Sequence, residues 1–391
     1  MRILYLTVDS PWPPRSGGDI RNAHIAKNAA RLGPAHAISL GPAYPGPPPE
    51  NITTIQASGI GEDNPWHFHD PVIRTRLRLP AETLDHIAAE ANGFGPDVAI
   101  VEGVMFADAI PVFQAAGIPV VLDMHNIESD LFRMIRRSKG PFRRLSDALR
   151  GGRRWRGLRE LDIATSRLAE ETWVTSEIDR RRLLELGGAD ATVIPNPIPN
   201  ETFFDIPLDP ARYSAPHALF LGHLSYPPNI AAARELATDI WPAASRAVPS
   251  ARLTIAGRTP VPAVRNLEKP GSIRIAADPA DPRGLVAEHG YTLMPIRQGG
   301  GTRVKALEAM AGGMVIIATA KAVEGLPIED GVHYLRAERT RDFATALARL
   351  HADPARTMAL AESARGYVRE RYNTRTLGDM IAARLQDLKR G

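Results

Sequence analysis

Residues 291–310 read YTLMPIRQGGGTRVKALEAM, and this stretch indicates how the chain is built. Residues 291–294 are a short uncharged run with the length of a buried strand, and the residues after 303 have the composition of a helix. Gly299, Gly300 and Gly301 lie between the two and allow a tight turn. A strand, a turn and a helix in this order are the repeating unit of a parallel sheet with helices on its faces.

The same alternation recurs along the chain. The first half has predicted strands at residues 3–8, 98–101, 120–122 and 172–174, with helical segments near 20–31, 81–91 and 176–186. The second half has predicted strands at residues 218–221, 252–256, 273–276, 291–294 and 314–318. We therefore predict an α/β protein with two doubly wound domains.

The predicted domain boundary follows the segment PNPIPN at residues 195–200. Its three prolines lack N–H donors and fix φ, so they continue neither a helix nor a central strand. We place the first domain at 1–205 and the second at 206–371. Residues 340–388 are predicted to be almost wholly helical, with breaks near Pro354 and Tyr372, and residues 372–391 are expected to pack back on the first domain.

Composition limits the classes of protein that fit. The 391 residues are 44% hydrophobic and 24% charged, as in an ordinary globular protein of two domains. There is no cysteine, which excludes disulfides, thiolate zinc sites and a cysteine nucleophile. No signal-peptide pattern and no apolar run of about 18 residues occurs, so we expect a cytoplasmic location. Residues 1–205 carry 23 basic and 26 acidic side chains and the remainder carries 25 and 18, which favours anion binding in the second half.

The glycine-rich loop has the features of an anion site. Glycines let the backbone approach a ligand, and Thr302 can cap a helix whose free N–H groups attract an anion. Arg303 and Lys305 in the first turn oppose the helix dipole, at a cost of about 0.3 to 1 kcal/mol per charge, which a bound diphosphate would reverse. The alternative is a plain glycine turn with two solvated cations, and it leaves the basic first turn unexplained.

Three other segments carry candidate residues. Gly17 and Gly18 follow the first strand, and His125 follows the strand at 120–122, so all three are expected at the edge of the sheet where ligands bind in open α/β folds. For each there is a structural alternative: a plain turn for the glycines and a buttressing role for the histidine. The third segment, residues 66–70 (WHFHD), is a weak metal signal, and we favour a surface loop.

Residues 133–159 form a concentrated basic segment. They carry eleven basic residues and one acidic residue, interleaved with apolar and aromatic ones. This pattern is typical of a helix that lies on an anionic membrane surface. The alternative is a solvated basic face over a buried stripe.

Taken together, these motifs make the chain similar to the family 4 retaining glycosyltransferases of the GT-B type. The resemblance rests on four landmarks in order, at residues 5–18, 123–128, 193–203 and 295–313. Within the last, GGGTRxKxxEAM resembles a recurrent subgroup of that family, and LGHLSYPPN at 221–229 matches its second-domain opening. The resemblance implies two Rossmann-like domains that face each other across a cleft, with a sugar nucleotide held mainly by the second.

The resemblance also implies roles for individual residues. Glu308 would bind the ribose hydroxyls, Arg303 and Lys305 the diphosphate, and His125 the transferred sugar. The implied substrate-binding residues are Gly17, Gly18, Arg258, Gly299, Gly300, Gly301 and Thr302. Two departures stand out: Gly300 occupies the position of a usual second glutamate, and the usual arginine and lysine after the first strand of the second domain are replaced by His223 and Pro228 nearby.

By this resemblance the chain transfers a sugar from a nucleoside-diphosphate sugar to a glycan, lipid-linked or small-molecule acceptor, with retention and without metal or cofactor. No Asp-x-Asp motif occurs, which argues against the metal-dependent single-domain transferases. A peripheral position at the inner face of the membrane would follow if residues 133–159 bind lipid. Two alternatives stay open: a sugar-nucleotide 2-epimerase and a non-catalytic nucleotide-sugar-binding subunit. A nucleic-acid partner is not expected, because the basic charge is confined to one segment.

Overall fold

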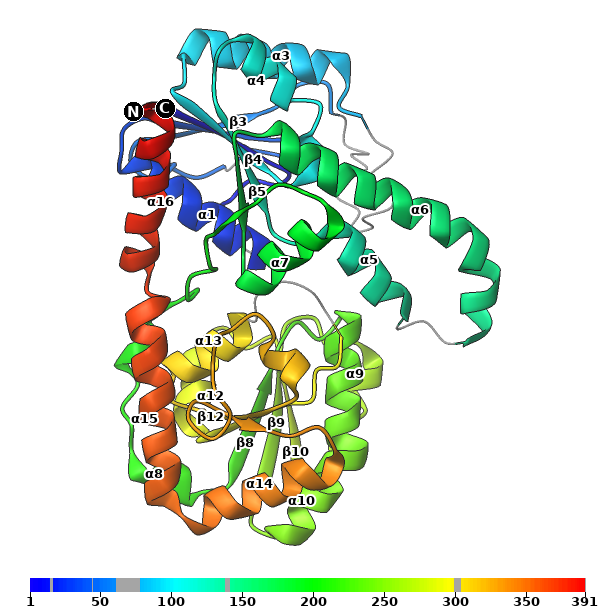
Figure 1. Cartoon of the computed structure of the whole chain (residues 1–391). Coiled ribbons are helices and arrows are strands. Elements are labelled where there is room, and N and C mark those ends of the chain that lie inside the picture. The colour runs from blue at the N-terminus through cyan, green and yellow to red at the C-terminus, as the bar shows by residue number, and fades with distance from the viewer. Residues whose placement is uncertain (15–16, 44, 61–77, 138–140, 299–303, 391) are drawn as a thin grey trace. The chain divides into compact units, whose positions relative to one another are not determined.

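The computed structural model in Figure 1 describes residues 1–14, 17–43, 45–60, 78–137, 141–298 and 304–390. The chain forms two compact units. The first comprises Met1–Pro197 and Thr374–Gly391, and the second comprises Ile198–Asn373. The sequence had placed the two changes of domain after residues 205 and 371, a few residues from these borders.

The first unit is built on a parallel sheet of seven strands in the order β3-β2-β1-β4-β5-β6-β7. The strands are β1 (Ile3–Thr7), β2 (Ala35–Ser39), β3 (Ile52–Gln56), β4 (Val98–Glu102), β5 (Val120–Met124), β6 (Glu171–Val174) and β7 (Thr192–Val193). The helices are α1 (Gly17–Ala30), α3 (Ala81–Phe94), η2 (Val104–Phe106), α4 (Ile110–Ala115), α5 (Glu128–Arg137), α6 (Pro141–Leu168), α7 (Glu177–Leu186) and α16 (Thr374–Arg390).

Both faces of this sheet are covered, which explains why its strands read as continuous apolar runs. Leu4 and Leu6 of β1 belong to one hydrophobic cluster, together with Phe113 of α4. Ile3 and Tyr5 point to the other face and belong to a second cluster. The alternation follows from the two-residue period of a strand.

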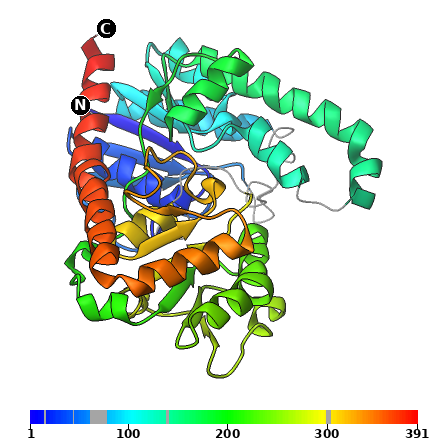
Figure 2. The same cartoon turned by 60° about the horizontal axis from the view of Figure 1, so that its bottom comes forward.

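The C-terminal helix α16 completes the second of these clusters. Its Ile381 and Leu385 are fully buried there, and Figures 1 and 2 both show α16 lying alongside α1. Gly378 allows the close approach, because a Cβ atom at that position would lie 2.0 Å from Asn28 Oδ1. Arg384 of α16 also pairs with Glu171 of β6 at 2.9 Å. The last helix is thus part of the first unit's core.

The second unit is built on a parallel sheet of six strands in the order β10-β9-β8-β11-β12-β13. The strands are β8 (His217–Leu221), β9 (Arg252–Gly257), β10 (Ile273–Ala277), β11 (Tyr291–Met294), β12 (Val315–Ala318) and β13 (Leu335–Arg336). The helices are η3 (Glu201–Asp205), α8 (Pro210–Ser214), α9 (Pro227–Glu235), η4 (Leu236–Ile240), α10 (Trp241–Ala247), α11 (Pro262–Arg265), α12 (Pro282–Glu288), α13 (Val304–Ala311), η5 (Ala320–Val323), α14 (Thr340–Ala352) and α15 (Pro354–Arg371). The predicted α/β class with two doubly wound domains is confirmed.

Each sheet has a point where the strand order reverses. In the first unit β1 is flanked by β2 and β4, and in the second β8 is flanked by β9 and β11. Connections leave these neighbouring strands in opposite directions, so a crevice opens beyond their carboxyl ends, and ligands of open α/β sheets bind in such crevices. The candidate residues are therefore best sought at the ends of β1 and β4 and at the ends of β8 and β11.

Part of the basic segment is occupied by contacts between α5 and α6. Phe132 and Leu158 are buried against each other with Trp155 packed beside them. The Arg133 guanidinium carbon lies 5.0 Å from the centre of the Trp155 ring. These three apolar side chains pack between the two helices. Among the described residues, no helix has both the length and the apolar character needed to cross a membrane.

A buried carboxylate connects the same two helices. Asp162 of α6 is inaccessible to solvent, and its two oxygens accept the backbone N–H groups of Glu128 (3.2 Å) and Ser129 (2.9 Å) at the start of α5. Burial raises the pKa of Asp162 from 3.8 to about 6, because desolvation outweighs the N–H donors. A residue of α6 therefore caps α5, directly after the loop that carries His125.

This raised pKa makes stability depend on pH in a defined direction. A carboxyl group whose pKa is higher in the folded state stabilises the fold when protonated, and this contribution is lost as pH rises through about 6. We expect the free energy of unfolding of the wild type, relative to Asp162→Asn, to fall by about 2 kcal/mol between pH 4 and pH 7. Urea unfolding of both proteins across this range measures it. A difference that does not change with pH would contradict the prediction.

Candidate functional site

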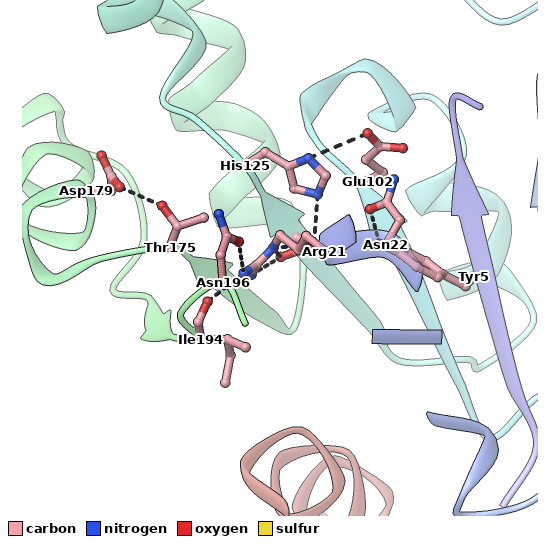
Figure 3. A network of polar contacts seen from close by, with 10 residues as sticks. Tyr5, Arg21, Asn22, Glu102, His125, Thr175, Asp179, Ile194 and Asn196 are labelled. Carbon is pink, nitrogen blue, oxygen red and sulfur yellow. Dashed lines mark hydrogen bonds and ion pairs between the residues drawn. The ribbon is translucent and has the colours of Figure 1, made fainter. Parts of the chain in front are cut away.

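A network of buried polar side chains lies at the carboxyl edge of the first sheet (Figure 3). Asp123 is the fourth residue of β5 and is fully buried, and His125 follows the last residue of that strand. Arg21 comes from α1 and is 1% exposed. A buried charge is stable only when it is paired and hydrogen-bonded, and these residues satisfy that condition together.

Arg21 and Asp123 form the strongest contact of the network. Arg21 Nε donates to both Asp123 oxygens at 2.9 Å, and Arg21 Nη2 lies 2.5 Å from Asp123 Oδ1. Burial alone would raise the pKa of Asp123, but the Arg21 guanidinium and the His125 imidazole lower it to about 2. Asp123 is therefore ionised at any pH at which the protein is expected to work.

His125 has a carboxylate near each ring nitrogen. Its Nε2 lies 3.1 Å from Asp123 Oδ2, and its Nδ1 lies 3.6 Å from Glu102 Oε1. Burial disfavours the imidazolium form, but the hydrogen bond to Asp123 and the charges of Asp123 and Glu102 outweigh it, so the pKa of His125 lies above its usual 6.5. With 16% of its side chain exposed, His125 can donate hydrogen bonds to a ligand and is a poor general base when protonated.

Glu102 connects this network to the end of β1. It is the last residue of β4, and its Oε2 accepts the backbone N–H of Val8 at 2.8 Å. Tyr5 of β1 donates to Asn22 Oδ1 of α1 at 2.6 Å. The ends of β1, β4 and β5 and the start of α1 thus meet at the reversal point of the sheet. Gly17 opens α1 here, and a Cβ atom at this glycine would meet no described heavy atom within 4 Å.

The second unit brings Lys305 to the corresponding place in its own sheet. Lys305 lies in the first turn of α13, and its Nζ donates to Asn229 Oδ1 at 2.6 Å. The same ammonium is 5.4 Å from the centre of the Phe220 ring of β8. Asn229 is 4% exposed and its Nδ2 donates to the His223 carbonyl at 2.8 Å. The cation that follows β11 is therefore held over the end of β8.

Glu308 lies one turn further along α13 than Lys305. Burial raises the pKa of Glu308 to about 7, and the nearby Lys305 lowers it only in part. No hydrogen bond to its carboxylate is found among the described residues. A partly buried carboxylate with a perturbed pKa, one turn from a fixed ammonium, is a candidate for ligand binding.

Several predicted residues cannot be placed together with these. Gly299, Gly300, Gly301, Thr302 and Arg303 lie outside the described residues, as does the segment at 66–70. Arg258 is exposed in the loop after β9, where its carbonyl accepts the N–H of Leu224 at 2.8 Å. Within the described ranges, no group of three or more histidine and acidic side chains is arranged to hold a metal ion.

Sequence reasoning missed three residues of these clusters, namely Arg21, Glu102 and Asn229. Glu102 had a usable signal. It directly follows the apolar run at 98–101, as Asp123 follows the apolar run at 120–122. Asn229 ends the segment at 221–229 that carries the resemblance, but no role was assigned to it. Arg21 had no signal, because nothing in the local sequence shows that a helical arginine is buried.

Comparisons with known proteins bear on the domain and the fold. Residues 215–353 match the family described as Glycosyl transferases group 1. None of the curated proteins matches the chain in sequence. Sucrose-phosphate synthase from Thermosynechococcus elongatus is similar in structure, with a TM-score of 0.74, 16% identity and 99% of each chain covered.

Two further solved structures are similar over nearly their whole length. HepE from Anabaena in complex with UDP has a TM-score of 0.69 at 14% identity, with 99% of this chain and 100% of that chain covered. WaaG, a glycosyltransferase involved in lipopolysaccharide biosynthesis, has a TM-score of 0.65 at 14% identity, with 98% and 99% covered. The two-unit fold is thus that of the GT-B glycosyltransferases. With a glycosyltransferase group 1 domain in its second unit, the chain is a glycosyltransferase.

The backbone near Lys305 is closely packed at two glycines, Gly222 and Gly257. Gly257, the last residue of β9, has φ of 150°, and a Cβ atom there would lie 1.6 Å from the Gly222 carbonyl oxygen. A Cβ atom at Gly222 would in turn lie 2.5 Å from Lys305 Nζ. Two glycines therefore leave the room in which the ammonium is held.

We expect Gly257→Ala to lower the free energy of unfolding by about 3 kcal/mol, because it combines overpacking with an unfavourable φ. The matched control is Gly284→Ala in α12, where a Cβ atom meets nothing within 4 Å and the helical position favours alanine. Urea unfolding measures both. Equal midpoints for Gly257→Ala and the wild type would refute the steric argument.

Proposed function

We propose that the chain is a retaining glycosyltransferase that moves a sugar from a nucleoside-diphosphate sugar to a glycan, lipid-linked or small-molecule acceptor, without a metal. The observation that carries the proposal is the pairing on α13 of a fixed ammonium, Lys305, with a carboxylate of raised pKa, Glu308, at the reversal point of the sheet in the glycosyltransferase group 1 domain. A diphosphate needs fixed positive charge, and a ribose needs a hydrogen-bond acceptor for its hydroxyls.

In the proposed reaction the bond between the anomeric carbon and the diphosphate oxygen breaks, and a bond to the acceptor oxygen forms on the same face. The acceptor proton passes to a phosphate oxygen, so no protein carboxylate has to act as a nucleophile. Lys305 stabilises the departing diphosphate, and Glu308 accepts hydrogen bonds from the ribose. Such preorganised charges contribute most when they are fixed before the reaction begins.

The proposed role of His125 is to hold the transferred sugar. Its Nε2 is held by Asp123, whereas its Nδ1 lies 3.6 Å from Glu102 and is the ring nitrogen proposed to face the sugar. Gly17 and Gly18 are proposed to approach the phosphate or the acceptor. The proposed roles of Gly299, Gly300, Gly301, Thr302, Arg303 and Arg258 in donor binding rest on the family resemblance alone.

UDP-glucose is the first donor to test, because HepE was crystallised both with UDP and with UDP-glucose. We expect His125→Ala to reduce kcat by about 100-fold or more, because it removes a donor that acts on the sugar during transfer. The dissociation constant for UDP should stay unchanged, because Lys305 and Glu308 are intact. Lys305→Met should weaken UDP by about 10- to 100-fold, since it loses a charge-assisted hydrogen bond.

The matched control for His125→Ala is His86→Ala, another histidine that lies beside a carboxylate, Glu90, at 3.6 Å but on α3. It should leave kcat unchanged. Incubation of the donor without acceptor, followed by NMR, separates the alternatives. A new epimer of the sugar nucleotide would support a 2-epimerase, and tight UDP binding with no turnover of any acceptor would support a non-catalytic subunit.

We also propose that residues 133–159 bring the enzyme to an anionic membrane that presents a lipid-linked acceptor. Trp155 and Leu158 of this segment pack between α5 and α6, so the binding would be carried by its basic side chains. Liposome flotation should therefore show greater recovery on anionic than on neutral vesicles, and the difference should disappear at high salt. Equal recovery on both kinds of vesicle would refute the membrane proposal.

A further inference from the structure

We propose that Arg21 is a positioning residue for His125, and that it ties the histidine to the segment where the chain leaves the first unit. The meaning of this for catalysis rests on the proposed function. The contact network itself does not rest on the proposed function, because all of its residues belong to the first unit.

The Arg21 guanidinium is held on two sides. Its Nε and Nη2 donate to Asp123 of β5, while its Nη1 donates to the Ile194 carbonyl at 2.6 Å and to Asn196 Oδ1 at 3.0 Å. Figure 3 shows the contacts of Arg21 with Ile194 and Asn196. All three partners are buried, with exposures of 0%, 1% and 8% for Asp123, Ile194 and Asn196. Only a planar fork can serve both sides, so a lysine ammonium is not an equivalent substitute.

Asp123 transmits this constraint to His125. The oxygen that contacts His125, Oδ2, also accepts from Arg21 Nε. Arg21 therefore fixes the plane of the carboxylate, and the carboxylate fixes the direction of the imidazole. An orienting carboxylate behind a histidine is a general device for holding one ring orientation. Here that carboxylate has in turn a buried arginine behind it.

Arg21 also contacts the segment in which the chain passes from the first unit to the second. Ile194 and Asn196 lie just before Pro197, and the second unit begins at Ile198. Asn196 belongs to the proline-rich segment that the sequence marks as a boundary. The Arg21 guanidinium thus contacts both Asp123, which orients His125, and the segment that leads to the second unit. A displacement of one of these partners would therefore shift the other.

The test compares Arg21→Met and Arg21→Lys with Asn196→Ala in the full chain. The first readout is the His125 ring, followed by NMR through a pH titration without substrate. The groups that act on its charge are Asp123 of β5, Glu102 of β4 and Arg21 of α1, of which only Arg21 disfavours the imidazolium. Loss of the Arg21 charge should move the titration midpoint of His125 to higher pH. Arg21→Lys, which keeps the charge, should move it less.

The second readout is turnover with UDP-glucose. We expect kcat to fall about 100-fold in Arg21→Met, about 10-fold in Arg21→Lys and several-fold in Asn196→Ala, with the UDP dissociation constant unchanged in all three. If Arg21 only stabilised the fold, the three variants would lower the unfolding temperature, but the kcat of the folded protein would not fall in this order. Asn196→Ala keeps the contacts between Arg21 and Asp123, and Arg21→Lys keeps the positive charge, so both variants report even if Arg21→Met fails to fold.

The matched control is Arg31→Met, at the residue that directly follows the same helix. Arg31 also pairs with a carboxylate, Asp379 at 2.8 Å, but both side chains are about half exposed. It should leave the His125 titration and kcat as in the wild type. An unchanged His125 midpoint in Arg21→Met would overturn the proposal, as would unchanged kcat. If His125→Ala itself leaves turnover intact, the proposed function fails, and the His125 titration still decides what Arg21 does.

Discussion

All strands of each sheet run in the same direction, and this constraint places the chemistry of the protein. Parallel strands deliver every following loop to one edge, so residues far apart in the chain meet there. In the first unit this brings the ends of β1, β4 and β5 together with the start of α1. In the second unit it brings Lys305, which follows β11, over the ring of Phe220 in β8. The two clusters arise from one rule, applied once in each unit.

Burial then determines what each cluster can do. Asp123 is ionised despite complete burial because Arg21 and His125 compensate it. Glu308, for which Lys305 is the one compensating charge among the described residues, has a pKa of about 7. The first carboxylate is a fixed negative support for the His125 ring, whose pKa it raises. The second is poised near neutrality, so a ligand that donates hydrogen bonds to it would favour its charged form.

Much of the fold could be predicted from the sequence, because buried parallel strands are read directly as apolar runs. The predicted helical breaks near Pro354 and Tyr372 are confirmed, as α14 ends at Ala352 and α16 begins at Thr374. The strands β2 and β3 were missed, because AHAIS and ITTIQ are mostly small or polar residues. Their place in the sheet comes from pairing with β1 and with each other, which no local pattern reports.

The candidate site was predictable only in part. His125, Lys305 and Glu308 follow from motifs, but Arg21 reads locally as a solvated helical cation. Its partners Asp123 and Ile194 lie 102 and 173 residues away in the sequence. A pairing at such a separation is determined by the sheet order alone. The supports of functional residues are therefore harder to foresee than the functional residues themselves, since motifs record the contacts made to ligands and leave out the contacts made behind them.

The most direct measurement is a crystal structure of the protein with UDP bound. The account predicts density for the nucleotide in the second unit, with the diphosphate in contact with Lys305 Nζ and the ribose hydroxyls on the Glu308 carboxylate. Nucleotide density away from α13, or a crystal that takes up no UDP at concentrations saturating for sugar-nucleotide enzymes, would contradict it.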